Sequence, residues 1–364
     1  MAIADRPLSP FSSEYASPSP GRGATGSLSS RPLRIVALGG GTGLSNVLQG
    51  LKQYTVAWDE PSKAGPLVEL AAVVTVSDDG GSSGKLRRAF DMLAPGDIRN
   101  CMVALAEDET LLSKLFQFRF ANGKGLDGHS FGNLFLTALT EVTGDFHQAI
   151  QLSSEVLAIR GHIFPSTLEN VRLQAELQGG RRVQGETRIS RAAGKIRKVH
   201  LRPRRCAPLP ETLEALADAD LITLGPGSLY TSVIPNLLVE GVADAIRQSR
   251  APVVYISNLM WQPGETDGHS ASDHLRAIHE HSSPDLVDIA VLSSSRIPAA
   301  ARRRYAEQEA RPVTNDRRRI ESLGVQVIQE VLTTTEQTIR HDSNRLAQLL
   351  VKIAGGTRST TVDR

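Results

Sequence analysis

The residues best suited to chemistry in this chain form the run Gly39-Gly40-Gly41-Thr42-Gly43, between an apolar segment (33–38) and a helix-like segment (44–51). Glycines let backbone N–H groups approach a bulky anion, and a helix start adds unpaired N–H groups and a positive dipole end. The spacing matches neither the dinucleotide fingerprint, which needs a glycine in place of Leu44, nor the P-loop, which needs a Lys-Ser/Thr pair. The run therefore predicts a phosphate loop of another kind; a glycine turn without a ligand is the alternative.

An acidic pair follows the next apolar run (70–76). Ligands of open parallel sheets bind at the carboxyl ends of strands, so Asp78 and Asp79 should lie beside the glycine run. These carboxylates could accept hydrogen bonds from ribose or sugar hydroxyls, hold a Mg²⁺ that bridges to phosphate, or position a nucleophilic hydroxyl. Helix capping or a solvated turn is the alternative.

Two further segments place polar residues before helix-like sequence. In the first, Asp97 is a candidate N-cap and Arg99 could pair with a phosphate or a carboxylate. In the second, Ser130 could cap a helix while His129 and Asn133 point into a cleft. A single His without a second metal-spaced ligand is equally consistent with a hydrogen-bonded structural residue, so both roles stay open for His129.

A Gly-Pro-Gly turn repeats the opening pattern after the apolar run 221–224. Two such loops at strand ends can hold one ligand from both sides. A polar loop that follows another strand end, from Gln262 to His269, suits covering or recognising a base or sugar. We therefore expect one shared cleft, to which this half of the chain contributes Gly225, Pro226, Gly227, Ser228, Thr231, Ser232, Asn258 and His269.

Alternating strand-like and helical runs predict an α/β fold, with a Rossmann-like parallel sheet and helices on both faces. Helix-period apolar spacing dominates residues 97–158, which we interpret as a helical insertion. Short alternating segments broken by glycines predict a small antiparallel β subdomain at about residues 159–205. The strand-like runs assigned to the main sheet are 33–38, 70–76, 221–224, 253–256, 287–292 and 325–331.

The ends of the chain differ in composition from its centre. Residues 1–30 are rich in Ser, Pro, Gly and Ala and predict a disordered tail, with an organellar transit peptide as the alternative. We expect one domain over residues 31–353, followed by a flexible C-terminal tail at 354–364. A chain of 364 residues can bury a large core.

Charge and cysteine content exclude several functional classes. The 41 basic and 39 acidic residues nearly balance, which argues against a dedicated nucleic-acid binder. Cys101 and Cys206 show no metal-ligand or disulfide pattern, and no apolar stretch approaches the roughly 20 residues of a membrane span, so a reducing cytoplasm is expected. Basic residues do gather in the β subdomain, but no aromatic residue interleaves them to stack on bases, which favours a solvated face. They are Arg181, Arg182, Arg188, Arg191, Lys195, Arg197, Lys198, Arg202, Arg204 and Arg205.

Six stretches resemble the gluconeogenesis factor (YvcK) family, a branch of the CofD-like superfamily: GGGTGLSNVLQGLK, VTVSDDGGSSGKLRR, PGDIRNCMVALA, GHSFGN, LGPGSLYTSVIPNLL and QPGETDGHSASDH. The resemblance covers about residues 31–353. It implies a Rossmann-like fold and a cytoplasmic bacterial protein that binds a UDP-sugar, particularly UDP-N-acetylglucosamine. It also implies a role in cell shape and envelope synthesis during growth on gluconeogenic carbon sources.

The other branch of the superfamily supplies the alternative function. The 2-phospho-L-lactate transferases are similar to this chain in the GGTG loop, the Asp pair and the Gly-Pro loop, and they move a phospholactyl group onto a deazaflavin precursor with Mg²⁺. That likeness would make Asp78 and Asp79 the metal-binding and acceptor-contacting residues. The SDDGGSSG and QPGETDG stretches resemble the gluconeogenesis factors instead, so we rank regulatory binding, without an assigned cofactor, ahead of Mg²⁺-dependent phosphotransfer.

The resemblance assigns roles within the predicted cleft. Gly40 to Gly43 and Gly225 to Ser228 would contact the diphosphate through backbone N–H groups. Asp78, Asp79 and Asn258 would recognise hydroxyls or the base, while His269 and Arg304 would close over the ligand. Many relatives carry Tyr where this chain has His269, whose imidazole offers less stacking area and a pH-dependent charge. Expected partners are the UDP-sugar, unidentified envelope or regulatory proteins and a second copy of the chain, but neither nucleic acid nor a membrane.

Overall fold

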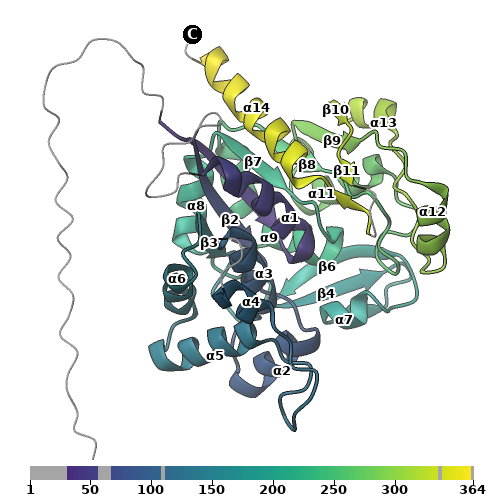
Figure 1. Cartoon of the computed structure of the whole chain (residues 1–364). Helices are drawn as coiled ribbons and strands as arrows, with labels where there is room; N and C mark the ends of the chain where they lie inside the picture. The colour runs from purple at the N-terminus through teal and green to yellow at the C-terminus, as the bar shows by residue number, and fades with distance from the viewer. Residues whose placement is uncertain (1–30, 56–66, 108–110, 335–337, 362–364) are drawn as a thin grey trace, which may run out of the picture. The chain divides into compact units, whose positions relative to one another are not determined.

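The computed structural model describes residues 31–55, 67–107, 111–334 and 338–361. The predicted tail at residues 1–30 lies outside the described residues. The described chain builds a seven-stranded parallel sheet flanked by helices and a separate three-stranded antiparallel sheet, which confirms the predicted α/β class (Figure 1).

The order of strands in the main sheet reverses at its centre. The sheet runs β10 (Gln326–Glu330), β9 (Ile289–Ser293), β8 (Val253–Ile256), β7 (Leu221–Leu224), β1 (Leu33–Gly39), β2 (Val68–Val74) and β3 (His162–Pro165). The chain proceeds outward from β1 to β3 and then in the other direction from β7 to β10. Ligands of open α/β sheets bind at the carboxyl edge of such a reversal, which here is where both predicted glycine loops begin.

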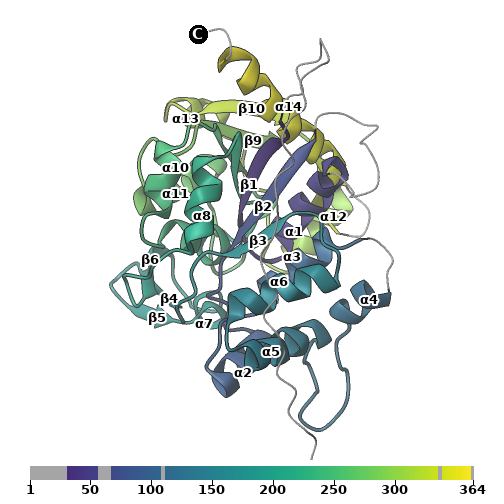
Figure 2. The ribbon, with the colours of Figure 1, turned by 90° about the vertical axis from the view of Figure 1, so that its left-hand side faces the viewer.

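Helices cover both faces of this sheet. In Figure 2, α8 (Pro210–Ala217), α10 (Val242–Gln248) and α11 (Ala271–His281) lie on one side, and α1 (Gly41–Leu51), α3 (Gly96–Leu105) and α14 (Ser343–Thr361) lie on the other. The remaining helical segments are α2 (Gly81–Phe90), α4 (Leu111–Gln117), α5 (Phe131–Thr143), α6 (Phe146–Val156), α7 (Glu186–Ile189), α9 (Ile234–Leu237), α12 (Ala299–Ala306), α13 (Arg317–Glu321), the 3₁₀ turn η1 (Lys52–Tyr54) and the π-helical turn η2 (Leu229–Val233). In the described part of the chain, no helix has both the length and the hydrophobicity that crossing a bilayer requires.

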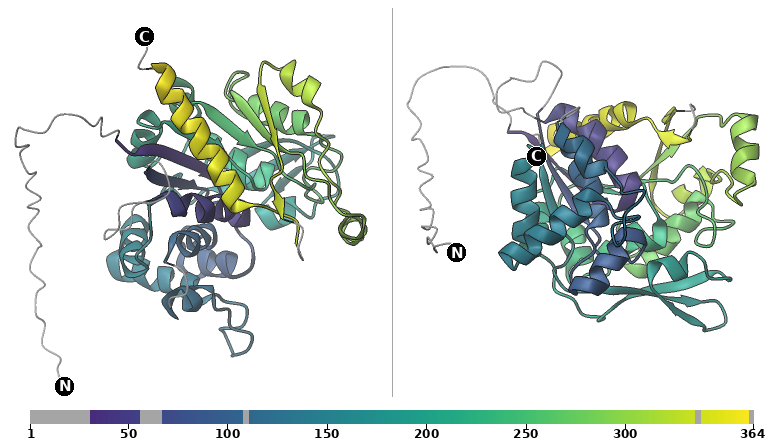
Figure 3. Two further views of the ribbon diagram at one scale, coloured as in Figure 1. Left: turned by 45° about the horizontal axis from the view of Figure 1, so that its top comes forward. Right: turned by 60° about the horizontal axis from the view of Figure 1, so that its bottom comes forward.

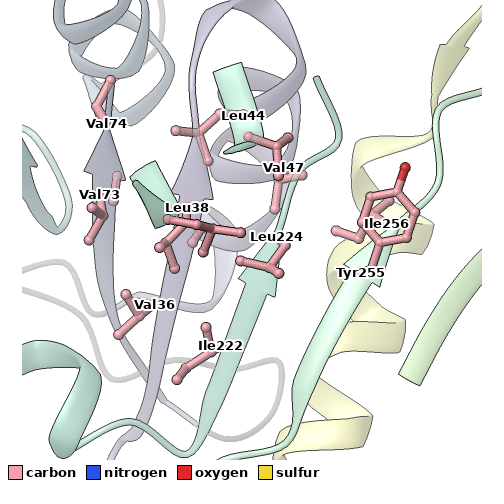
Figure 4. Close-up of a cluster of buried hydrophobic side chains, with 14 of the residues drawn as sticks. Val36, Leu38, Leu44, Val47, Val73, Val74, Ile222, Leu224, Tyr255 and Ile256 are labelled. Atoms are coloured by element: carbon pink, nitrogen blue, oxygen red, sulfur yellow. The ribbon is translucent and has the colours of Figure 1, made fainter. Parts of the chain in front are cut away.

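Packing between α1 and the sheet fixes the start of that helix. Figure 4 shows Leu44 and Val47 of α1 beside Leu38 of β1 and Leu224 of β7. All four side chains are completely buried. Because burying one such side chain stabilises the fold by about 1.5–3 kcal/mol, the turn between β1 and α1 is held firmly at the sheet edge.

The helical insertion begins later than the sequence predicts. The helix periods expected between residues 97 and 158 correspond to α3, α4, α5 and α6, and Ser130 caps α5 by accepting a hydrogen bond from the N–H of Asn133, as predicted. However, α3 packs against α1, β2 and β3, so it belongs to the helical layer of the sheet. The helical period alone does not distinguish a crossover helix from an inserted one, because both bury one face.

The antiparallel subdomain is smaller than predicted. It consists of β4 (Arg172–Leu177), β5 (Arg182–Gln184) and β6 (Ile196–Arg202), paired in the order β5-β4-β6. The segment His162–Pro165, which we assigned to it, instead forms the edge strand β3 of the main sheet and pairs in parallel with β2. Parallel pairing joins strands distant in sequence, so four residues carry no local sign of it. A further antiparallel pair joins β11 (Thr333–Thr334) and β12 (Arg340–His341).

The segment at residues 354–364, which we predicted as a flexible tail, is helical as far as Thr361, where α14 ends. The helix passes through Gly355 and Gly356. Leu346, Leu350 and Ala354 recur at helical spacing and are completely buried, which holds this segment against the domain. Figure 3 shows α14 running alongside α1 and β1.

Replacing glycine by alanine should change the free energy of unfolding in opposite directions at two positions of α1 and α14. A Cβ at Gly50 would lie 2.0 Å from the carbonyl oxygen of Ser343, so Gly50→Ala should lower the free energy of unfolding by roughly 1–3 kcal/mol. A Cβ at Gly356 would meet no atom within 4 Å, so Gly356→Ala should raise it by about 0.5–1 kcal/mol through helix propensity. Urea unfolding of both variants measures the two effects, and effects of the same sign would contradict this packing.

Candidate functional site

Two loops meet where the strand order reverses. We call Gly39–Gly43, after β1, the glycine loop, and Gly225–Ser228, after β7, the GPGS loop. A Cβ at Gly43 would lie 2.3 Å from the carbonyl oxygen of Pro226, and one at Gly40 would lie 2.5 Å from Oδ2 of Asp97. Atoms cannot approach so closely, so both positions need glycine for packing. Gly41 has a φ of +59°, a left-handed conformation that glycine adopts without strain.

A cavity of about 640 Å³ lies in front of these loops, and we call it the glycine-loop cavity. Its size falls within the range of about 300–1,000 Å³ that is typical of small-molecule sites. Of the predicted residues, Gly40, Gly41, Thr42, Gly43, Pro226, Gly227, Ser228, Ser232 and Asn258 line it. Arg99, for which the sequence offered a phosphate or carboxylate partner, and Gln262 of the predicted polar loop line it as well. Residues that we had not assigned to the site also line it, among them Asn46, Gln49, Asn100, Tyr305, Ile339, Arg340 and His341.

The first turn of α1 supplies hydrogen-bond donors to this cavity. Thr42 and Gly43 lie in that turn, where backbone N–H groups have no carbonyl of an earlier turn to bind. The helix dipole adds a partial positive charge at the same end. These groups suit an anion such as phosphate, which is the chemistry that the glycine run predicts.

Arg99 of α3 adds a full positive charge. Its Nη2 donates a hydrogen bond to Oδ1 of Asn100 at 2.5 Å, whereas its buried Nε has no hydrogen-bond partner within the described part of the chain. Gly132 leaves space for this side chain, since a Cβ there would lie 2.9 Å from Cδ of Arg99. Burial, followed by the charge of Arg119, lowers the pKa of Arg99. A bound anion would offset the cost of this desolvated cation.

Asp97 does not cap α3 as we predicted. The helix starts at Gly96, and the residue before it makes no side-chain cap. The Asp97 carboxyl group is instead buried behind the glycine loop, where it accepts a hydrogen bond from the N–H of Gly41. Burial, reinforced by the charge of Asp78, raises the pKa of Asp97 to about 7, against the opposing effects of the Gly41 N–H and Arg99. Sequence reasoning missed this role because the capping pattern explained the residue locally.

Asn258 supports the GPGS loop rather than facing the cavity with free amide groups. Its Oδ1 accepts from the N–H of Gly227 at 3.1 Å, and its Nδ2 donates to the Gly227 carbonyl oxygen at 2.8 Å. Gln262 adds a second support, since its Oε1 accepts from the N–H of Leu229 at 3.2 Å and its amide donates to the Ser228 hydroxyl. The sequence analysis singled out the QPGETDG stretch as part of the site, but it did not predict that Gln262, the first residue of that stretch, supports the GPGS loop.

The acidic pair lies outside the glycine-loop cavity. Asp78 Oδ1 accepts from the N–H of Gly80 at 2.8 Å, and its carboxyl group also binds the Ser83 hydroxyl. Asp79 Oδ1 accepts from the N–H and the hydroxyl of Thr187 at 2.9 and 3.0 Å. Burial raises the pKa of Asp78, and the neighbouring charge of Asp79 adds to this effect. Both carboxyl groups therefore hold local structure at the end of β2.

The carboxyl groups in this region do not form a metal centre as they stand. Burial and the charges of Asp78 and Asp97 raise the pKa of Glu186 well above its usual range, which shows how closely these acids gather. Nevertheless, the described residues contain no group of three or more His, Cys, Asp or Glu side chains arranged to hold a metal ion. A Mg²⁺ ion at this place would therefore need phosphate oxygens of a bound nucleotide in addition to one or two of these carboxylates.

Four other predicted residues do not line the glycine-loop cavity. His129 is buried, and its Nδ1 lies 3.1 Å from the Ser82 hydroxyl, which fits the structural alternative. Asn133 is buried in the first turn of α5, and Thr231 donates to Glu265 Oε1 at 3.4 Å. Gly225 has a φ of +75° and begins the GPGS loop behind the lining residues.

The two residues expected to close over the ligand also lie elsewhere. The His269 ring contacts Tyr230 edge-on, with 6.1 Å between ring centroids, and its Nε2 lies 3.4 Å from the Tyr230 hydroxyl. Arg304 lies over the Tyr305 ring, with Cζ 5.7 Å from the ring centroid. The neighbouring Tyr305, together with Arg340, lines the cavity instead.

Comparisons with known proteins agree with this architecture. Residues 35–333 match the model of the family described as 2-phospho-L-lactate transferase CofD. A Nostoc sp. protein is 49% identical over 89% of this chain and 69% of its own length. Proteins named gluconeogenesis factor are 45% identical in Halalkalibacterium halodurans, over 87% of this chain and 95% of that protein, and 43% identical in Bacillus subtilis, over 88% and 98%.

A solved structure extends the likeness to three dimensions. The crystal structure of protein BH3568 from Bacillus halodurans superposes with a TM-score of 0.83 at 45% identity, covering 88% of this chain and 100% of that one. A second crystal structure of the same protein, described as a member of the UPF0052 family, gives the same TM-score of 0.83. The family match and these relatives together show that the chain belongs to the CofD family and, within it, to the gluconeogenesis factors.

Proposed function

We propose that this protein binds a UDP-sugar, specifically UDP-N-acetylglucosamine, in the glycine-loop cavity and acts as a regulatory binding protein. In this role it supports cell shape and envelope synthesis during gluconeogenic growth. It acts in the cytoplasm as a homo-oligomer, and it signals through envelope or regulatory proteins that are not yet identified. The observation that carries the proposal is the meeting of two glycine-containing loops at the strand-order reversal, around a cavity of nucleotide-sugar size.

The diphosphate occupies the end of the cavity beside α1. The backbone N–H groups of Thr42 and Gly43 donate to phosphate oxygens, and Arg99 supplies a positive charge with an unsatisfied Nε. The N–H of Gly227 is already bound to Asn258, so the GPGS loop contributes mainly through Ser228. The diphosphate therefore contacts the start of α1 and the hydroxyl of Ser228, which is fewer groups than the sequence predicted.

The uridine and sugar groups contact the remaining cavity wall. Tyr305 and Ile339 provide apolar surface, while Arg340 provides hydrogen-bond donors. Asn46 lines the same cavity with a buried Oδ1 that has no partner within the described chain. A rotation of this side chain toward the cavity would let its oxygen accept from a sugar hydroxyl or the N–H of a uracil ring, which would remove the cost of leaving it unpaired.

Phosphotransfer is the second candidate function, and the description of the matching family favours it. The test is to incubate the protein with a phospholactyl nucleotide, a deazaflavin-type acceptor and Mg²⁺. Formation of the phospholactyl-acceptor product would show that the protein is a transferase and not a regulatory binding protein. We rank binding first, since the side chains of Asp78 and Asp79 are engaged by Gly80 and Thr187.

Substituting Gly41 tests where the diphosphate binds. A Cβ there would have only Asp97 Oδ1 nearby, at 3.9 Å, so Gly41→Asp should fold and yet place a carboxylate in the cavity. We expect a roughly 100-fold loss of affinity for UDP-N-acetylglucosamine by isothermal titration, because like charges oppose each other there.

A matched control is available at Gly324. Its φ of +82° is also left-handed, and a Cβ there would meet no atom within 4 Å. Gly324→Asp should therefore bind the UDP-sugar like the parent protein. Equal binding by the Gly41→Asp variant would place the ligand elsewhere.

Asp97 predicts a pH dependence of binding. Its pKa of about 7 means that the carboxyl group loses its proton as the pH rises through neutrality, and the resulting charge lies behind the loop that holds the diphosphate. If binding requires the protonated form, the affinity should be about tenfold lower at pH 8 than at pH 6. Burial lowers the pKa of the lining residue His341 to about 4, so this group stays neutral over that range.

The variant Asp97→Asn separates this effect from other titrations. The amide oxygen can still accept from the Gly41 N–H but carries no charge at any pH, so the affinity should stay flat between pH 6 and pH 8. A flat profile for the parent protein, or an unchanged slope in Asp97→Asn, would contradict the role of this carboxyl group.

A further inference from the structure

A second cavity, of about 630 Å³, lies between α2 and the small antiparallel sheet. It shares no lining residue with the glycine-loop cavity. We call it the basic cavity, because its lining contains one carboxylate, that of Asp79, and six basic side chains. These are Lys85, Arg87 and Arg88 of α2, Arg172 of β4, and Arg188 and Arg191 in or just after α7.

The positive charges in this cavity are not neutralised by ion pairs. Within the described part of the chain, none of the six basic side chains forms a salt bridge. Lys85 donates instead to a carbonyl oxygen, that of Asp127, at 3.1 Å. Elsewhere in the same subdomain, by contrast, Arg197 pairs with Glu176 at 2.6 Å. The lining of the cavity therefore keeps an excess of positive charge, which the nearby carboxylates of Asp78, Asp79 and Asp91 offset only in part.

Arg87 makes this imbalance costly. Its side chain is only 5% exposed, and its nitrogens donate to uncharged oxygens, namely the carbonyls of Ser77 and Val171 and the Asn170 side chain. Burial, followed by the positive charge of Arg172, lowers the pKa of Arg87 against the opposing charges of Asp79, Asp78 and Asp91. The carboxylates near Arg87 therefore only partly compensate its burial and the second cation, and a bound anion would add to that compensation.

We propose that the basic cavity is a second ligand site, which binds a small phosphorylated compound carrying at least two negative charges. Guanidinium groups match phosphate oxygens in pairs, and four of the lining arginines are exposed enough to reach a ligand. The start of α2 at Gly81 also lies in the lining and adds the positive end of a helix dipole.

The shape of the cavity favours a small ligand over a nucleic acid. The space is concave and similar in volume to the glycine-loop cavity, which suits a compound of metabolite size. No aromatic side chain lines it, so it offers no surface on which bases could stack. The basic residues of this subdomain, which we expected to form a solvated face, thus include a subset that converges on one site.

Inorganic pyrophosphate is a suitable probe for this site. The titration uses the full chain carrying Gly41→Asp, so that the glycine-loop cavity repels the probe and calorimetry reports the basic cavity. Arg172→Ala with Arg188→Ala removes two exposed lining arginines. Arg182→Ala with Arg204→Ala is the matched control, because both residues are exposed, lie in the same region and do not line the cavity.

We expect the first pair to lower the affinity for pyrophosphate at least about tenfold and the control pair to leave it within about twofold. Thermal unfolding checks that both double variants remain folded. Absence of pyrophosphate binding, or an equal loss in both double variants, would overturn the proposal. Single-stranded RNA that binds and loses affinity equally in both double variants would identify an extended nucleic-acid surface, which would also overturn it.

Discussion

The contact between two stretches of main chain, at Gly43 and at Pro226, is the constraint on which the candidate site depends. No side chain fits between these segments, since even a methyl group on Gly43 would overlap the Pro226 carbonyl. The strand-order reversal brings the two loops together, and the buried packing of α1 keeps them there. Asn258 and Gln262 then hold the second loop through its backbone, so the cavity is shaped mainly by groups that do not themselves need to touch a ligand.

Buried charges of opposite sign set the electrostatics of this region. Arg99 and Asp97 lie two positions apart on α3, yet one lines the cavity while the other is buried behind the glycine loop. The positive group is under-satisfied and the negative group is destabilised by burial, so both respond in the same direction to an incoming anion. Neighbouring acids strengthen that response, because the charge of Asp78 raises the pKa of Asp97 and the charges of Asp78 and Asp97 raise the pKa of Glu186.

Structural features that depend on neighbouring residues in the sequence could be predicted. Those that depend on contacts between residues far apart in the chain could not. The glycine loop, the GPGS loop and most strands of the main sheet carry their own turn chemistry or apolar periodicity. Three other features depend on residues far away in the chain. They are the pairing of His162–Pro165 with β2, the hydrogen bonds of Asn258 to Gly227, and the burial of the Asp97 carboxyl group. The helical C-terminal segment depends on distant partners in the same way, because contacts of α14 with the domain outweigh the low helix propensity of Gly355 and Gly356.

The strand-order reversal also has a consequence for the integrity of the molecule. Its two loops are separated by about half of the chain, so each half of the chain supplies only one of the two loops that border the cavity. Any compound bound between the loops acts as a clamp across the two halves of the sheet, and its binding free energy adds directly to the stability of the whole domain. Ligand binding in the cavity is therefore coupled to unfolding of the whole domain rather than to the ordering of one surface segment. The free energy of unfolding should consequently rise with the concentration of the ligand.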